Sequence, residues 1–236
     1  MTVVRRLLAL GIAAVVLAVA TACAPVAHAA PAATSPRPSA ALSAAPAASH
    51  DAHAVVTIGD SIMAGYGLEP GEAWPELLAR RTGVPLVNLA CSGAGFVAVG
   101  DCGTDFSTLV DEAIAFDPAV VIVQASDNDL EEDPHDIDAA AAAAVRELRR
   151  ALPGAQLVGI GALWNVPGDT PAAITGSTDA LRAAMHAAGG VFVSLGQPLQ
   201  DDQDLLQADG EHPTPEGQRV LAERVRAALD DAGVTL

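Results

Sequence analysis

The sequence contains no lysine, and arginine supplies all 12 of its basic residues. Against these stand 29 aspartate and glutamate residues, which give a formal net charge of −17 at pH 7. A protein that binds nucleic acid needs a basic face for the phosphates. The shortage of positive charge therefore excludes nucleic acid as an expected partner, and the acidity is that of a solvated surface.

Aromatic residues are also scarce, at 3% of the chain, although 51% of its 236 residues are apolar. Alanine and aliphatic side chains must therefore fill the core. The length suits one domain with appendages. We find no internal repeat in the sequence.

The N-terminal segment has the features of an export signal. Two arginines precede an apolar run that extends to Ala22, and this run is too short and too rich in alanine for a membrane span. An Ala-Thr-Ala-Cys stretch ending at Cys23 resembles a bacterial lipobox, whereas an Ala-His-Ala stretch ending at Ala29 suits ordinary secretion. We favour the lipobox because Cys23 directly follows the apolar run. Residues 1–22 are therefore predicted to be a signal peptide, and the protein to be an exported cell-surface lipoprotein, with free secretion as the alternative.

Residues 23–54 are rich in alanine, proline and serine and contain almost no large apolar side chain. Such a segment cannot bury enough surface to offset its ordering entropy, so we expect a disordered tether. A tether is most useful when its far end is held, which supports a lipid anchor on Cys23. That anchor would be the protein's one contact with a membrane, and residues 55–236 would form the folded domain.

Apolar, β-branched runs alternate with helical patterns from residue 55 onward. Strands are expected at Val55–Ile58, Pro85–Leu89, Ala119–Gln124, Gln156–Gly161 and Val191–Leu195. Helices are expected at Trp74–Arg81, Thr104–Ala115, Ile137–Leu152, Ser177–Ala188 and Thr214–Asp231. Strands separated by helices form a parallel sheet that is covered on both faces. With right-handed crossovers, the predicted fold is an α/β, three-layer α/β/α sandwich.

Four polar segments stand out. They are Gly59-Asp60-Ser61, Asn88-Leu89-Ala90-Cys91-Ser92-Gly93, Ser126-Asp127-Asn128-Asp129 and Asp209-Gly210-Glu211-His212. The first three follow predicted strands, and open α/β sheets bind ligands at the carboxyl ends of their strands. A serine hydroxyl reacts at neutral pH only when a base takes its proton, and a histidine oriented by an aspartate is such a base. The segments thus predict nucleophilic catalysis by a serine.

In this order the four segments resemble the signature blocks of the SGNH (GDSL) hydrolase family. The resemblance implies a flavodoxin-like sheet of five parallel strands and catalysis without a metal or cofactor. By resemblance, Ser61 is the nucleophile, His212 the base and Asp209 the residue that orients the imidazole. The oxyanion hole would consist of the backbone N–H groups of Ser61 and Gly93 and the side-chain amide of Asn128.

The run from Gly59 to Leu68 most resembles the esterase and thioesterase branch of that family. We therefore predict a monomeric serine esterase, or lipase-like enzyme, that cleaves small-molecule, lipid or carbohydrate esters through an acyl-enzyme. One alternative is an acyltransferase or deacetylase that acts on cell-wall or carbohydrate hydroxyls. Another is a non-catalytic module that binds carbohydrate or lipid. The intact set of catalytic residues argues against this second alternative.

A disulfide and a substrate wall are also predicted near the site. Once Cys23 carries lipid or is removed, Cys91 and Cys102 remain, and an even number of cysteines in an exported protein predicts one disulfide. Trp164 and Asn165 follow the fourth strand and are candidates for a substrate wall, although ordinary packing would explain Trp164 equally well.

The acidic residues of the first and third segments are not expected to be catalytic residues or metal ligands. Asp60 is predicted to cap the turn or helix that follows it. Ser126 stands where the family has glycine, so it would add a side chain near the oxyanion hole. The acidic run 127–133 lacks the ligand spacing of an EF-hand, so we expect a solvated loop with Asp127 facing solvent, not a calcium site.

Overall fold

The computed structural model describes residues 54–236, so the predicted signal peptide, the lipid-anchor cysteine Cys23 and the predicted tether up to residue 53 lie outside the described residues. The strands are β1 (Val55–Ile58), β2 (Leu86–Asn88), β3 (Val120–Gln124), β4 (Gln156–Ile160) and β5 (Val191–Val193). The helices are α1 (Ser61–Ala64), α2 (Trp74–Thr82), α3 (Phe106–Ala115), α4 (Pro134–Ala151), α5 (Ala172–Ala187) and α6 (Pro215–Asp231). Short 3₁₀ helices are formed by η1 (Asn128–Glu131) and η2 (Gln203–Leu205).

The strands form one five-stranded sheet in the order β2-β1-β3-β4-β5, and every neighbouring pair is parallel. Val55 pairs with Leu86 of β2 on one side and with Val120 of β3 on the other. The strand β2 therefore lies on one side of β1, and the next strand in the chain, β3, lies on the other. The strand order reverses at β1, and this reversal is the topological switch point where such sheets bind ligands. The predicted α/β fold with a five-stranded parallel sheet is confirmed.

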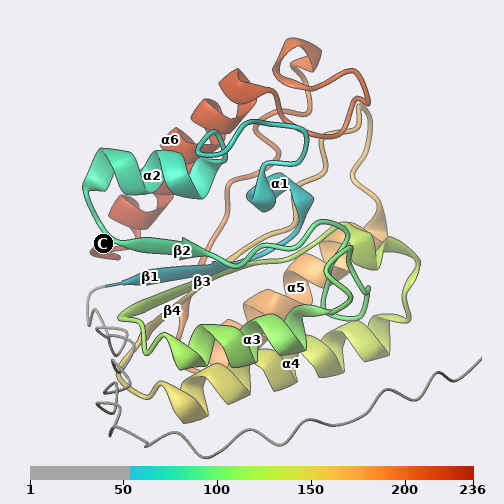
Figure 1. Cartoon of the computed structure of the whole chain (residues 1–236). Coiled ribbons are helices and arrows are strands. Elements are labelled where there is room, and N and C mark those ends of the chain that lie inside the picture. Colours follow the sequence, from blue (N-terminus) through green and yellow to red (C-terminus); the bar gives the residue numbers. More distant parts are fainter. Residues whose placement is uncertain (1–53) are drawn as a thin grey trace, which may run out of the picture. The chain divides into compact units, whose positions relative to one another are not determined.

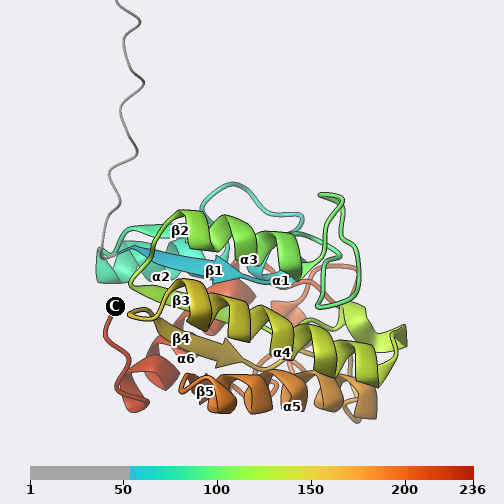
Figure 2. The same cartoon turned by 90° about the horizontal axis from the view of Figure 1, so that it is seen from below.

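Helices cover both faces of the sheet, as Figures 1 and 2 show. The helices α3, α4 and α5 pack on the face that carries Val56 and Ile58, and α1, α2 and α6 pack on the face that carries Val55. Successive side chains of a strand point to opposite faces, so β1, buried at every position, contributes to both cores. In the part of the chain that the structure describes, no helix combines the length and apolar character needed to cross a membrane.

Two helices differ most from the prediction. The segment after Ser61 is the short helix α1, which Asp60 caps at its N-terminus and Gly65 at its C-terminus with φ at 75°. Helix α5 begins at Ala172, five residues before the predicted Ser177, because Pro171 supplies the N-cap and Gly176 is accommodated inside the helix. A four-residue helix is too short to show a periodic pattern, and the glycine made the first turn of α5 resemble a loop.

Candidate active site

Ser61 lies at the carboxyl end of β1 and is the first residue of α1. The cap that starts this helix is the Asp60 carboxylate, whose Oδ1 accepts a hydrogen bond from the Ile62 N–H at 3.0 Å, as predicted. The loop after β2 is tied to the same point, because the Cys91 N–H donates to the Gly59 carbonyl at 3.0 Å. The fold thus presents the serine at the switch point, beside the loops that follow β2 and β3.

A continuous chain of hydrogen bonds joins Ser61 to the predicted base and its partner. The His212 Nε2 atom lies 3.0 Å from Ser61 Oγ, and His212 Nδ1 lies 2.9 Å from Asp209 Oδ2. The other Asp209 oxygen accepts hydrogen bonds from the backbone N–H groups of Glu211 and His212, each at 3.0 Å. With the proton on Nδ1 held by the carboxylate, Nε2 is free to accept the serine proton.

The segment that carries His212 is held at both ends. Leu206 and Pro213 form an antiparallel bridge, and the Gln207 N–H donates to the His212 carbonyl at 2.7 Å. The Gln207 side chain donates to the Tyr66 carbonyl at 2.7 Å, so it links this segment to the chain just after α1. The Tyr66 and His212 ring centroids are 4.5 Å apart. These contacts fix where the imidazole lies relative to the serine.

A second glutamine, Gln218, holds α1 in place through hydrogen bonds. The Gln218 side chain on α6 accepts from the Trp74 N–H and donates to the Ile62 carbonyl, both at 2.8 Å, and it is buried. It therefore ties the helix of Ser61 to α2 and α6. Neither Gln207 nor Gln218 was among the residues predicted for the site. A signal existed for Gln218, because it is a polar residue on the apolar face of α6, whereas nothing in the sequence distinguishes Gln207.

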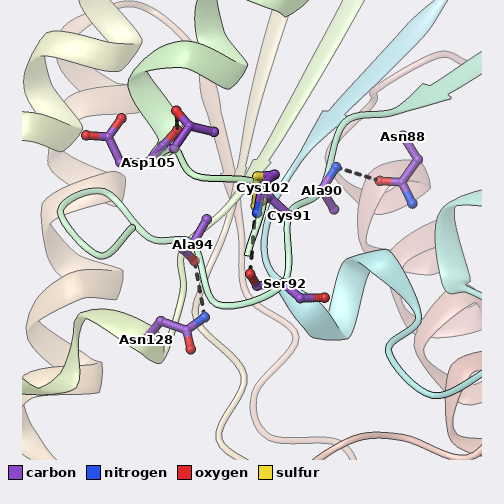
Figure 3. Close-up of a disulfide and its surroundings, with 9 residues drawn as sticks. Asn88, Ala90, Cys91, Ser92, Ala94, Cys102, Asp105 and Asn128 are labelled. Carbon is purple, nitrogen blue, oxygen red and sulfur yellow. Dashed lines mark hydrogen bonds between the residues drawn. A yellow bond between two sulfur atoms is a disulfide. The ribbon is translucent and has the colours of Figure 1, made fainter. Parts of the chain in front are cut away.

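Gly93 and Asn128, the other predicted oxyanion-hole residues, lie in the loops after β2 and β3. Gly93 has φ of 80°, in the left-handed region that favours glycine. Among the hydrogen bonds of residues 54–236, neither the N–H of Gly93 nor that of Ser61 has a partner. The Asn128 side-chain amide donates to the Ala94 carbonyl at 3.1 Å, which Figure 3 shows. The structure thus brings Asn128 to the loop that contains Gly93.

The acidic segment after β3 is solvated only in part: residues 130–133 are exposed, as predicted, whereas the two aspartates before them correct the prediction. Both Asp127 and Asp129 are buried. The Asp129 carboxylate accepts hydrogen bonds from the backbone N–H groups of Phe96, Val97 and Ala98, at 2.8 to 3.0 Å. Buried backbone donors need acceptors, and this carboxylate supplies them for the whole turn. Its role is to hold the loop after β2 against the loop after β3.

The carboxyl groups around the site titrate differently. Burial, together with the nearby charges of Asp60 and Glu211, raises the pKa of Asp127 to about 8. Burial also raises the pKa of Asp60 to about 6, although a hydrogen bond with Ser126 opposes the rise. Burial acts to raise the pKa of Asp209 as well, but hydrogen bonds from Glu211 and His212 outweigh it and lower that pKa. At neutral pH Asp209 is therefore ionised and Asp127 protonated.

The protonated state of Asp127 predicts a pH-dependent stability. Its folded-state pKa of about 8 lies above the unfolded value, so the folded protein binds more protons and loses stability as pH rises towards 8. Between pH 5 and pH 8 the wild type should lose on the order of 4 kcal/mol of unfolding free energy relative to Asp127→Asn, because each pH unit between the two pKa values contributes about 1.4 kcal/mol. Thermal unfolding over this range measures the difference.

The control for this experiment is Asp138→Asn, which neutralises an exposed carboxylate on α4. Its stability should follow the wild type at every pH. Parallel pH curves for the wild type and Asp127→Asn would contradict a protonated Asp127.

The substrate-wall candidates lie at the same edge of the sheet. Trp164 is half-buried and packs against the core beneath α3–α5. Its backbone N–H donates a hydrogen bond to the Gln197 side chain at 2.7 Å. Asn165 is buried, and its amide donates to the Glu211 carbonyl at 2.7 Å. Asn165 therefore contacts the residue just before His212 and helps to hold the histidine segment.

Cys91 and Cys102 form a disulfide, as predicted, with Cα atoms 6.2 Å apart (Figure 3). The bond closes the loop that contains Gly93. Within this loop the Asp101 N–H donates to the Ser92 carbonyl at 2.8 Å. The disulfide and this hydrogen bond together limit the movement of Gly93.

The chain is similar to known proteins both in sequence and in fold. Residues 57–220 match the GDSL-like Lipase/Acylhydrolase family. A GDSL lipase of Mycobacterium tuberculosis is 33% identical over 187 residues, which cover 72% of this chain and 79% of the relative. The crystal structure of TesA is similar in fold, with a TM-score of 0.62 at 23% identity over 76% of this chain and 99% of that one.

The psychrotrophic esterase EstA from Pseudoalteromonas sp. has the same TM-score of 0.62, at 19% identity over 76% of this chain and 97% of its own. These two structures support the fold alone. The family match is a sequence match, and it extends over Ser61, Asn128 and His212. The chain therefore belongs to the GDSL-like lipase/acylhydrolase family.

Proposed function

We propose that the protein is a serine esterase that hydrolyses carboxylic esters through an acyl-enzyme. The observation that carries this proposal is the hydrogen-bond chain from Ser61 Oγ through His212 to Asp209, with distances of 3.0 and 2.9 Å. Ser61 and His212 are separated by 151 positions in the sequence, so the whole fold is needed to bring them together. This arrangement of a nucleophile, a base and an orienting carboxylate is that of a Ser-His-Asp triad.

Each group has a defined step. As Ser61 Oγ attacks the ester carbonyl carbon, its proton passes to His212 Nε2, and the C=O electrons move onto the oxygen. The backbone N–H groups of Ser61 and Gly93 are available to stabilise this oxyanion. His212 then gives its proton to the alcohol as it leaves, and an acyl group remains on Ser61. A water molecule, deprotonated by His212, then attacks the acyl carbon. The bond from this carbon to Ser61 Oγ breaks as His212 returns the proton to Oγ, which releases the carboxylic acid and regenerates the serine.

The loops around Ser61 favour an ester with an apolar part. Four large apolar side chains in the loops that follow β1 to β4 are 37% to 66% exposed: Tyr66, Val99, Leu130 and Val166. These loops follow the carboxyl ends of neighbouring strands, on the side of the sheet where Ser61 lies (Figure 1). Apolar surface on a binding site favours ligands that bury apolar area against it.

The proposal is tested with p-nitrophenyl esters of increasing acyl chain length. We expect hydrolysis that depends on Ser61, and kcat/KM that rises from acetate to medium-length chains as the acyl group buries apolar surface around Tyr66, whose ring centroid lies 4.5 Å from that of His212. Each buried CH₂ contributes about 0.8 kcal/mol at most, so the rise should approach several-fold per added carbon. Absence of hydrolysis for every ester, or equal hydrolysis by Ser61→Ala, would overturn the proposed activity.

The disulfide is expected to support both stability and turnover. Reduction, or the double change Cys91→Ser with Cys102→Ser, should lower the unfolding free energy by about 2–3 kcal/mol, as the chain-entropy model gives for a loop of this size. Turnover should also fall, by about tenfold, at temperatures where the domain stays folded, because the loop holds the Gly93 N–H in place. Thermal unfolding and ester hydrolysis measure the two effects.

Cys23→Ser, which leaves the disulfide pair intact, is the matched control and should behave as the wild type in both assays. Two thiols at Cys91 and Cys102 that react with an alkylating agent in the unreduced protein would refute the disulfide. Unchanged turnover after reduction of the folded domain would refute its link to Gly93.

A further inference from the structure

Ser126 is a fully buried serine, 0% exposed, that lies between β3 and Asn128. Its hydroxyl oxygen accepts two hydrogen bonds from Asn128, one from the backbone N–H at 3.1 Å and one from the side-chain amide at 2.8 Å. A buried hydroxyl with two short bonds to one residue restrains that residue's side-chain torsions. Ser126 therefore determines how the Asn128 amide is oriented.

The second hydrogen of the same amide donates to the Ala94 carbonyl, at 3.1 Å (Figure 3). An asparagine amide has two N–H bonds, and both are accounted for. Rotation of the amide by 180° would place its oxygen against the Ala94 carbonyl oxygen, and two acceptors repel each other. The pair of bonds therefore permits one orientation only, in which one N–H always points at the loop of Gly93 and Ala94.

Ser126 also acts on the segment of the nucleophile, because its side chain opposes the rise in the pKa of the buried Asp60 carboxyl. Asp60 in turn caps α1, the helix that begins with Ser61.

We propose that Ser126 is a positioning residue, which holds the Asn128 amide so that one N–H is directed at the oxyanion. This inference rests on the proposed esterase function. As the carbonyl oxygen becomes negative, it competes with the Ala94 carbonyl for that N–H and attracts it more strongly because it carries charge. The bond to Ser126 persists, so the amide does not have to reorient during the reaction, which is the requirement for electrostatic stabilisation of a transition state.

The first test is the kinetics of Ser126→Ala and Ser126→Gly on a p-nitrophenyl ester. Loss of the hydroxyl should lower kcat by about tenfold, less than loss of a whole oxyanion donor, and should leave KM within about twofold. Ser126→Thr keeps the hydroxyl and should recover most of the loss. The matched control is Ser177→Ala, which removes another buried hydroxyl that bonds to the Ser126 carbonyl at 3.5 Å but makes no hydrogen bond to Asn128. Its kcat should equal that of the wild type.

The second test is a double-mutant cycle with Asn128→Ala. If Ser126 acts through Asn128, its removal has no further effect on kcat once the amide is gone. Equal losses in the wild-type and Asn128→Ala backgrounds would overturn the inference, as would an unchanged kcat in Ser126→Ala or a loss confined to KM. Failure of the esterase proposal has a different signature, because the wild type would then show no hydrolysis that depends on Ser61.

Discussion

Replacement of Ser61 or His212 by alanine is expected to lower ester turnover by a factor of about 10³ or more. Ser61 supplies the atom that attacks the carbonyl, and His212 lies 3.0 Å from it and takes its proton. Because the two groups act in the same step, the double variant should be little slower than either single variant. Initial rates on a p-nitrophenyl ester measure the loss. Each rate is divided by the concentration of folded protein, so that unfolding of a variant is not counted as lost activity.

The matched control is His186→Ala, which removes an exposed histidine near the end of α5. It should retain full activity. The melting temperatures of all the variants should stay within a few degrees of the wild type, because neither Ser61 nor His212 contributes a large apolar side chain to the core. Losses that simply multiply in the double variant would mean that the two residues act independently and would contradict a triad.

Replacement of Asn128 by alanine is expected to lower kcat by about 10²–10³, with KM little changed. The amide contributes an N–H at the loop of Gly93, where the backbone donors of the site lie. Such a donor interacts with the transition state more strongly than with the substrate, so its loss appears in kcat. Steady-state kinetics over a range of ester concentrations separates the two parameters.

Asn128→Asp provides the sharper variant, because it keeps the shape of the side chain and replaces the N–H donors by a carboxylate. It should be at least as slow as Asn128→Ala, since a negative charge would face the oxyanion. Full activity in Asn128→Asp would show that the amide donates nothing to the transition state. A change confined to KM would assign Asn128 to substrate binding.

Most of the sheet could be predicted from the sequence because its central strands are continuous apolar runs. The bounds of β1 were predicted to the residue, and β3 begins one residue later than expected, at Val120. The outer strands β2 and β5 are shorter than predicted. Each has a partner on one side only, so pairing ends where the neighbouring strand ends, and the apolar pattern does not carry that information.

The site was less predictable where a side chain interacts with a distant segment. The four polar segments indicated Ser61, Asn128 and His212, since each follows or precedes a recognisable pattern. The burial of Asp129 could not be predicted, because the N–H groups that it binds belong to Phe96, Val97 and Ala98, more than 30 positions earlier. A run of acidic residues normally faces water, and only the fold reveals which of them are buried.

The central claim is that Ser61 is an activated nucleophile, and covalent labelling tests it most directly. The folded protein is treated with a fluorophosphonate, digested, and analysed by mass spectrometry, with His212→Ala treated in parallel. We expect a single adduct, on the Oγ atom of Ser61, and we expect it to form in proportion to the loss of ester hydrolysis. Labelling of His212→Ala should be slower by orders of magnitude. An active wild-type protein that forms no adduct, or forms it on another residue while Ser61 stays unmodified, would contradict the account.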